Sequence, residues 1–238
     1  MSVVITKRQK ALSTQTEKNK FYQIKEAIKI LKGAPATKFN QSVELQCKLG
    51  VDLTANDQVV RGTAVLPHGQ GKKLRVIVFS KDENAKAAKE AGAAHVGGED
   101  LVEKVLGGWM EFDVAVSTPS MMKEVGKLGK VLGPRGLMPS PKAGTVTDNP
   151  AKAVKEVMGG RIEFKMDKQA NVNTLVGKLD FSEEQLVANL VVLIEAMMVA
   201  RPKSLKGTYI KSAHLSSTMG PGVRLDLSKY IKTEETAD

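Results

Sequence analysis

Residues 128–146, LGKVLGPRGLMPSPKAGTV, combine glycines and prolines with the cations Lys130, Arg135 and Lys142. Glycine-rich basic loops can bind phosphate through backbone N–H groups and lysine, which is the chemistry of nucleotide-binding enzymes. A P-loop also requires Ser or Thr after its Gly-Lys pair, and the segments GKK, GKL and GKV of this chain lack that hydroxyl. The simpler interpretation is a connecting segment, in which glycines supply positive φ and prolines stiffen the turns.

Other catalytic and nucleotide-binding motifs are also missing from the sequence. A dinucleotide-binding domain carries G-x-G-x-x-G after its first strand, whereas the apolar segment 74–80 is followed by the glycine-free, acidic KDENAK. No G-x-S-x-G nucleophile elbow is present, and the three histidines are too far apart for a local metal motif. We expect no catalytic residue, no metal and no cofactor. An α/β enzyme acting on a phosphorylated metabolite remains the alternative.

The composition indicates a globular protein with an anionic partner. The 238 residues include 36 Lys and Arg against 26 Asp and Glu, and the formal net charge of +10 favours a polyanion. The single cysteine excludes an intrachain disulfide and suits a reducing compartment. No apolar run reaches the length of a membrane span, and the polar start lacks the core of a signal peptide. We expect a cytoplasmic protein without a membrane partner.

Near its start, the chain shows a helical pattern followed by alternating patterns. Apolar residues at helical spacing predict a helix over 21–33 that ends at a glycine. Its buried face is predicted to comprise Phe21, Ile24, Ile28 and Leu31. Alternation of apolar and polar residues predicts a half-buried strand over 42–51, and a second strand follows over 58–67.

The middle of the chain has a different character, because short, continuously apolar strands alternate with helices. This order predicts a parallel sheet covered on both faces. The predicted strands are 74–80 and 112–119, and the predicted helices are 82–93, 99–108, 120–133 and 148–160.

After residue 160 the half-exposed pattern returns. It predicts a β-hairpin, then a helix that opens with a capping box, then two strands joined by a tight turn. These segments are 161–167 with 171–180, then 182–202, then 207–217 with 222–228.

Together these patterns predict an α/β protein of two domains. A split α/β domain with an antiparallel sheet is built from both termini, residues 1–69 and 161–238, and a second α/β domain is inserted at 70–160. The two outer segments carry 11 cations against 5 anions and 11 against 10, a net charge of +7, whereas the insert carries 14 against 11, or +3. The more basic split domain is therefore the better candidate for a polyanion surface.

Residues 125–146, VGKLGKVLGPRGLMPSPKAGTV, closely resemble the signature of a family of bacterial ribosomal proteins, the first member of the large-subunit series, which forms the mobile stalk beside the exit site. Further segments resemble blocks of this family in the same order, and together they cover nearly the whole chain after the first twenty residues. These segments are 38–72, 91–119, 160–168 and 206–226.

The resemblance implies that the inserted domain is a three-layer, Rossmann-like domain that holds no nucleotide. It implies a structural, non-catalytic component of the large ribosomal subunit that binds large-subunit rRNA at the mobile stalk. It further implies that the protein assists release of deacylated tRNA from the exit site and represses translation by binding the mRNA of its own operon. We expect a monomer when the protein is free of the ribosome.

The principal RNA surface of the family falls on the strand near residue 42 and on the turn near residue 218. Carried onto this chain, the RNA-binding residues are Lys38, Phe39, Ser42, Glu44, Lys48, Ser212, Thr218, Met219 and Gly220. Alternation places Glu44 and Lys48 on the outer strand face, where lysine can meet phosphate and a carboxylate can accept from a 2′-hydroxyl.

Phe39 is assigned differently by pattern and by resemblance. It shares its parity with Val43 and Leu45, so the pattern alone predicts a core residue, whereas the resemblance places it on the RNA surface. A secondary RNA contact is predicted in the inserted domain, at Lys130, Arg135 and Lys142.

Overall fold

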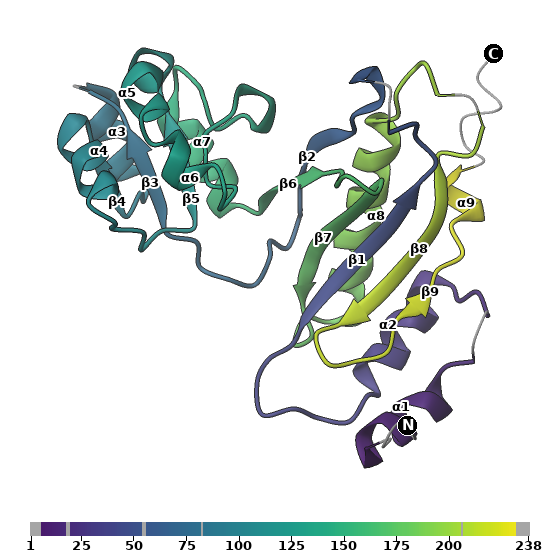
Figure 1. Cartoon of the computed structure of the whole chain (residues 1–238). Helices are drawn as coiled ribbons and strands as arrows, with labels where there is room; N and C mark the ends of the chain where they lie inside the picture. Colours follow the sequence, from purple (N-terminus) through teal and green to yellow (C-terminus); the bar gives the residue numbers. More distant parts are fainter. Residues whose placement is uncertain (1–5, 18–19, 54–55, 82, 206, 232–238) are drawn as a thin grey trace, which may run out of the picture. The chain divides into compact units, whose positions relative to one another are not determined.

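The computed structural model describes residues 6–17, 20–53, 56–81, 83–205 and 207–231. Contacts divide the chain into two compact units, the first made of Met1–Gly71 with Glu163–Asp238 and the second of Lys72–Ile162. The predicted α/β class is confirmed, with an antiparallel sheet drawn from both chain ends and a parallel sheet in the insert (Figure 1).

The first unit is built on a four-stranded sheet in the order β7-β1-β8-β9. Its strands are β7 (Asn171–Lys178), β1 (Ser42–Leu49), β8 (Ile210–Ser217) and β9 (Val223–Arg224). Neighbouring strands pair antiparallel throughout. Segments from the two ends of the chain therefore lie side by side, with β1 between β7 and β8.

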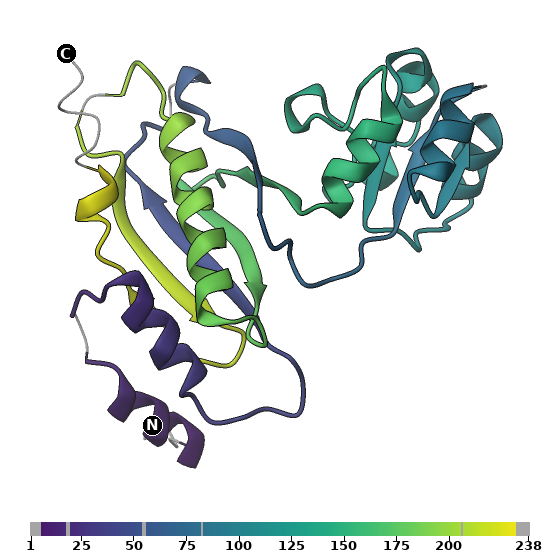
Figure 2. The same ribbon diagram turned by 180° about the vertical axis from the view of Figure 1, so that it is seen from behind.

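Helices cover one face of this sheet. The helices α2 (Ile24–Lys32) and α8 (Glu183–Val199) pack on each other and on the strands, and Figure 2 shows both in front of the sheet. The buried residues of β1 are the apolar members of its alternation, which is why one face joins the core and the other stays polar. The predicted capping box starts α8, because Ser182 Oγ accepts from Gln185 N at 3.2 Å.

Smaller elements complete the first unit. They are α1 (Lys7–Gln15), η1 (Asn56–Gln58), β2 (Arg61–Val65), α9 (Ser228–Ile231) and most of β6 (Arg161–Lys165), whose first two residues belong to the second unit. The prediction of a β-hairpin over 161–180 is only partly right. A single bridge, Met166 to Val172, joins its two arms; β6 then pairs with β2, while β7 pairs with β1.

The predicted burial of Phe21 is wrong. The helix begins at Ile24, so Phe21 lies outside it, and its side chain is 56% exposed. The other three predicted positions of that helix face are buried. Phe21 matches the helical spacing of the apolar residues although it lies three positions before the helix starts.

The second unit has three layers. A parallel sheet in the order β4-β3-β5 forms the middle layer, from strands β4 (His95–Gly97), β3 (Val76–Phe79) and β5 (Val114–Ser117). Because successive side chains point to opposite faces, Ile77 and Phe79 of β3 enter one core while Val76 and Val78 enter the other.

Helices of the second unit supply the two outer layers. One core includes residues of α4 (Glu99–Leu106), η2 (Pro119–Met121), α5 (Met122–Gly126) and α6 (Gly129–Leu132). The other includes residues of α3 (Glu83–Glu90) and α7 (Pro150–Met158). The single helix predicted over 120–133 is therefore divided into η2, α5 and α6, and the short strand β4 had no sequence prediction.

The glycines of segment 128–146 shape its backbone. Gly136 and Gly144 have φ of 70° and 67°, the left-handed region that favours glycine. A Cβ on Gly144 would also lie 2.1 Å from Arg161 Nη2. After η3 (Pro141–Ala143), the chain runs beside β5, because Ser117 N donates to Thr145 O at 2.9 Å. These positions give the glycines a role in turn geometry.

Candidate RNA interface

The start of β1 and the turn after β8 are joined by hydrogen bonds. Thr218 N donates to Ser42 O at 3.1 Å, and Ser42 N donates to Thr218 Oγ1 at 3.0 Å. Met219 N donates to Oε1 of the buried Gln41 at 2.9 Å. Residues separated by more than 170 positions in sequence thus form one fixed corner of the sheet, and the Thr218 hydroxyl is part of that structure.

This corner presents two large apolar side chains to solvent. Phe39 is 53% exposed and Met219 is 51% exposed. The pattern-based prediction of a core position for Phe39 is wrong, because β1 begins only at Ser42 and its alternation does not extend back to residue 39. Lys38 is exposed beside Phe39, so a cation and an apolar ring are adjacent in the chain.

Gly220 closes the turn under steric constraint. Its N–H donates to Ser217 O at 3.0 Å, and a Cβ on Gly220 would lie 2.1 Å from Ser217 Oγ. The Ser217 side chain is buried, and its hydroxyl has no hydrogen-bond partner. The turn therefore accommodates glycine at this position and leaves no room for a larger residue without a shift of Ser217.

The outer face of the sheet is polar, as the alternation predicts. Glu44 pairs in register with Ser216 and Lys48 with Ser212, so these side chains stand on the face opposite the helices. Lys48 Nζ donates to Gln169 O. Lys48 lies six positions after Ser42, which is about 20 Å along a strand. The nine predicted residues consequently form two groups: one at the fixed corner, continued by Glu44, and a pair, Lys48 with Ser212, at the far end of β1.

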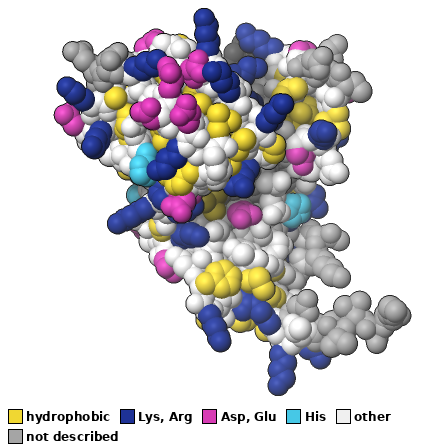
Figure 3. Space-filling view, turned by 60° about the vertical axis from the view of Figure 1, so that its left-hand side comes forward, with side chains coloured by type: hydrophobic (Ala, Val, Ile, Leu, Met, Phe, Trp, Pro, Cys, Tyr) yellow, Lys and Arg dark blue, Asp and Glu magenta, His cyan; other side chains and the backbone are white. Residues whose placement is uncertain are grey.

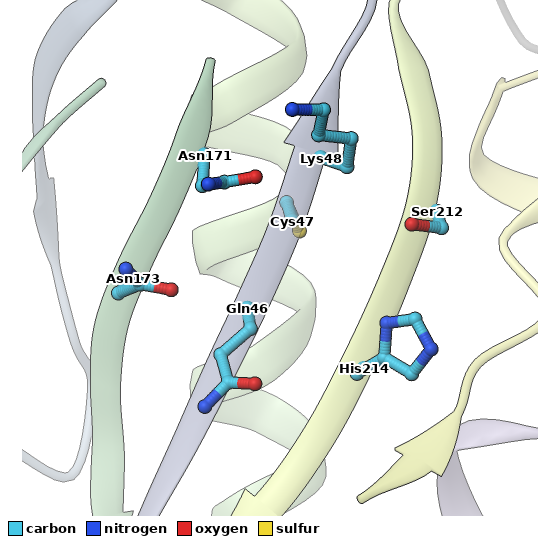
Figure 4. A pocket seen from close by; sticks show the side chains of 7 residues that line it. All are labelled: Gln46, Cys47, Lys48, Asn171, Asn173, Ser212 and His214. Carbon is cyan, nitrogen blue, oxygen red and sulfur yellow. The ribbon is translucent and has the colours of Figure 1, made fainter. Parts of the chain in front are cut away.

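Around the pair at the far end, and toward the corner, lie side chains that the sequence prediction missed. Figure 4 shows this part of the outer face, a hollow lined by residues of β7, β1 and β8 that include Lys48 and Ser212. The additional polar residues there are Gln46, Asn171, Asn173 and His214. Period-two alternation in SVELQCKL, NVNTL and IKSAHLSS carries the signal for these four residues, since each shares its parity with an outward residue of its strand.

His214 lies on β8, between β1 and β9. It pairs in register with Gln46 on one side and with Arg224 on the other. Burial, together with the positive charge of Arg224, lowers the pKa of the His214 imidazole. The neutral ring is therefore the form that this site favours, able to donate from one nitrogen and accept at the other.

The three predicted secondary contacts lie in the second unit. Lys130 is on α6, Arg135 follows that helix, and Lys142 is on η3; all three are exposed. On the face of the molecule in Figure 3, Lys and Arg side chains are interspersed with Asp and Glu. The mixture of charges on this face therefore does not by itself locate a binding surface.

Within the described residues, no helix is both long and apolar enough to cross a membrane.

Comparison with known proteins gives the chain its family. Residues 30–221 match the model of the family described as "Ribosomal protein L1p/L10e family". The chain is 51% identical over 222 residues to the large ribosomal subunit protein uL1 of Protochlamydia amoebophila, a match that covers 93% of this chain and 94% of the relative. It is 49% identical over 224 residues to the protein of the same name from Beutenbergia cavernae, covering 94% of each chain.

A third relative agrees with the first two. The large ribosomal subunit protein uL1 of Leifsonia xyli subsp. xyli is 51% identical over 223 residues, covering 94% of this chain and 97% of the relative. The family model spans both units and both ends of the polar sheet face. Membership of a family of ribosomal proteins also sets aside the alternative of an α/β enzyme. The chain belongs to the ribosomal protein L1p/L10e family.

Proposed function

We propose that the protein is a structural component of the large ribosomal subunit that binds large-subunit rRNA through the first unit. The binding surface comprises the fixed corner around Ser42 and Thr218 and the outer face of the sheet. The carrying observation is that Met219, more than half exposed, stands on a turn that hydrogen bonds to Gln41 and Ser42 hold in place, and that Phe39, exposed to the same extent, lies two residues before Gln41 in the chain. Such a preorganised apolar contact loses little conformational freedom when RNA binds.

The chemistry around the corner suits a folded RNA. Lys38 and Lys48 are exposed cations able to neutralise phosphates, and Glu44 can accept a hydrogen bond from a 2′-hydroxyl or a base amine. Gly220 has no side chain, so the turn backbone can come close to a sugar or phosphate. Ser212 adds a hydroxyl at the far end of the face.

More specific roles follow from the resemblance noted in the sequence. We propose that the protein binds rRNA at the mobile stalk, helps to release deacylated tRNA from the exit site, and represses its own operon by binding the mRNA with the same surface. The first unit is the RNA-binding domain, and Lys130, Arg135 and Lys142 of the second unit form a secondary RNA contact. The free protein is a monomer.

The proposal predicts a salt-dependent affinity for an rRNA fragment of the stalk region. Each phosphate neutralised by a lysine or arginine releases counterions, so the logarithm of the binding constant should fall linearly with the logarithm of the salt concentration. Equilibrium binding of the full chain measured across a salt series tests this. Absence of binding at moderate salt, or equal binding to an unrelated RNA of the same length, would contradict the proposed function.

A further inference from the structure

An exposed aromatic ring and a guanidinium are stacked at the edge of the sheet opposite β7. Arg224 Cζ lies 4.2 Å from the centroid of the Phe21 ring, and the Phe21 side chain is 56% exposed. A guanidinium on one face of a ring leaves the other face free, and the exposure of the Phe21 side chain means that much of the ring is accessible to solvent. Backbone hydrogen bonds of Tyr22, the residue after Phe21, hold the two segments that carry this pair together.

The segment around residue 22 joins the edge of the sheet through an isolated β-bridge. Tyr22 forms a parallel bridge with Leu225: Tyr22 N donates to Arg224 O at 2.9 Å, and Asp226 N donates to Tyr22 O at 2.9 Å. Tyr22 is buried, so its chain neighbour Phe21 points to the opposite face. Phe21, Arg224 and His214 therefore share the outer face that carries the proposed RNA contacts.

The charges beside Phe21 favour an anion. A hollow lined by Phe21, Lys211 and Ser212 borders the ring. Neither Lys211 nor Arg224 forms an ion pair with any residue that the structure describes. The carboxylate in the hollow, Asp226, already accepts hydrogen bonds from the backbone and hydroxyl of Ser228. The cations are thus available to phosphate.

We propose that Phe21 and Arg224 form a stacking site for one unpaired base of the rRNA, with Lys211 beside the phosphate of that nucleotide. The inference rests on the proposed function and extends its surface across the sheet. Aromatic side chains and arginine planes are the groups on which splayed RNA bases stack. Three strand spacings separate the Phe21 segment from β1, or about 14 Å, so one folded RNA can reach both places.

The stacking claim is tested by substitutions that separate aromatic character from volume and from charge. Phe21→Leu keeps an apolar side chain but removes the π face, and should weaken rRNA binding by roughly tenfold without changing the salt slope. Phe21→Trp keeps a ring and should bind at least as well as the wild type. Arg224→Gln should weaken binding and reduce the salt slope by about one. Leu53→Ala, at an equally exposed apolar position, is the matched control and should bind like the wild type.

The outcomes distinguish this inference from the proposed function. If the wild-type chain fails to bind the rRNA fragment, the proposed function fails and takes the stacking site with it. If the wild type binds but Phe21→Leu binds equally well, the stacking site is refuted and the proposed function stands. Equal weakening by Phe21→Leu and Phe21→Trp also refutes stacking. Thermal unfolding of each variant checks that it is folded. The Phe21 variants should unfold at the wild-type temperature, because Phe21 lies outside the core.

Discussion

Gly220→Ala probes the turn on which the RNA surface depends. The added Cβ would meet Ser217 Oγ at 2.1 Å, far inside van der Waals contact, so the serine must rotate or the turn must move. The φ of Gly220 is not positive, so the cost comes from this contact rather than from backbone strain. Overpacking of this kind costs about 1–3 kcal/mol of the free energy of unfolding.

Removal of the opposing hydroxyl should relieve the clash. Ser217 Oγ is buried without a hydrogen-bond partner, so Ser217→Ala alone should change the free energy of unfolding by less than about 1 kcal/mol. In the double variant the nearest atom is Ser217 Cβ at 3.3 Å, a contact that a shift of a few tenths of an ångström relaxes. Urea unfolding of both single variants and the double variant should give a favourable coupling of about 0.5–3 kcal/mol.

RNA affinity measured on the same set separates packing from direct contact. If Gly220 permits close approach of RNA to the turn, the double variant should regain stability and still bind rRNA more weakly than Ser217→Ala. Full recovery of affinity with stability would show that Gly220 acts through packing alone. Additive unfolding free energies, with no coupling between the two substitutions, would refute the steric argument itself.

Two further predictions concern stability. Gly144→Ala should lower the free energy of unfolding by about 1–3 kcal/mol in urea titrations, because φ is 67° and the Cβ would meet Arg161, whereas Gly126→Ala, whose Cβ meets nothing within 4 Å, should be neutral or stabilising. The pKa of the His214 imidazole is lowered in the folded state. The stability that the neutral ring contributes is therefore fully present above the unfolded-state pKa, near 6.5, and is lost as the pH falls from there through the folded-state pKa. His214→Asn should flatten this part of the profile, and an unchanged slope below pH 6.5 would exclude the imidazole as its source.

Periodicity predicted the interior of elements well and their ends poorly. Phe21 and Phe39 fit the apolar spacing of a helix and a strand, but α2 starts at Ile24 and β1 starts at Ser42. Both rings are consequently exposed, and both belong to surfaces proposed to bind RNA. A periodic pattern cannot reveal where hydrogen bonding stops, because the first residue outside an element still matches the spacing.

The sequence patterns also do not predict which distant segments pair with one another. The alternation over residues 161–180 predicts two strands, but only the tertiary structure shows that β6 separates from β7 after one bridge and pairs with β2. The three-residue strand β4 is too short for any periodic signal. The outward side chains of β7 and β8 were visible in the sequence as alternation, but their position beside β1 depends on strand order, which local patterns do not encode.

The central claim is that rRNA binds the first unit at the fixed corner, and two variants of the full chain test it most directly. Phe39→Ala/Met219→Ala removes two half-exposed side chains and should weaken binding to the stalk-region rRNA fragment by roughly tenfold or more. Lys130→Gln/Arg135→Gln/Lys142→Gln removes three exposed cations of the second unit and should weaken it far less. A large loss in the triple variant, with wild-type affinity in the Phe39/Met219 variant, would place the principal RNA contact in the second unit and contradict the account.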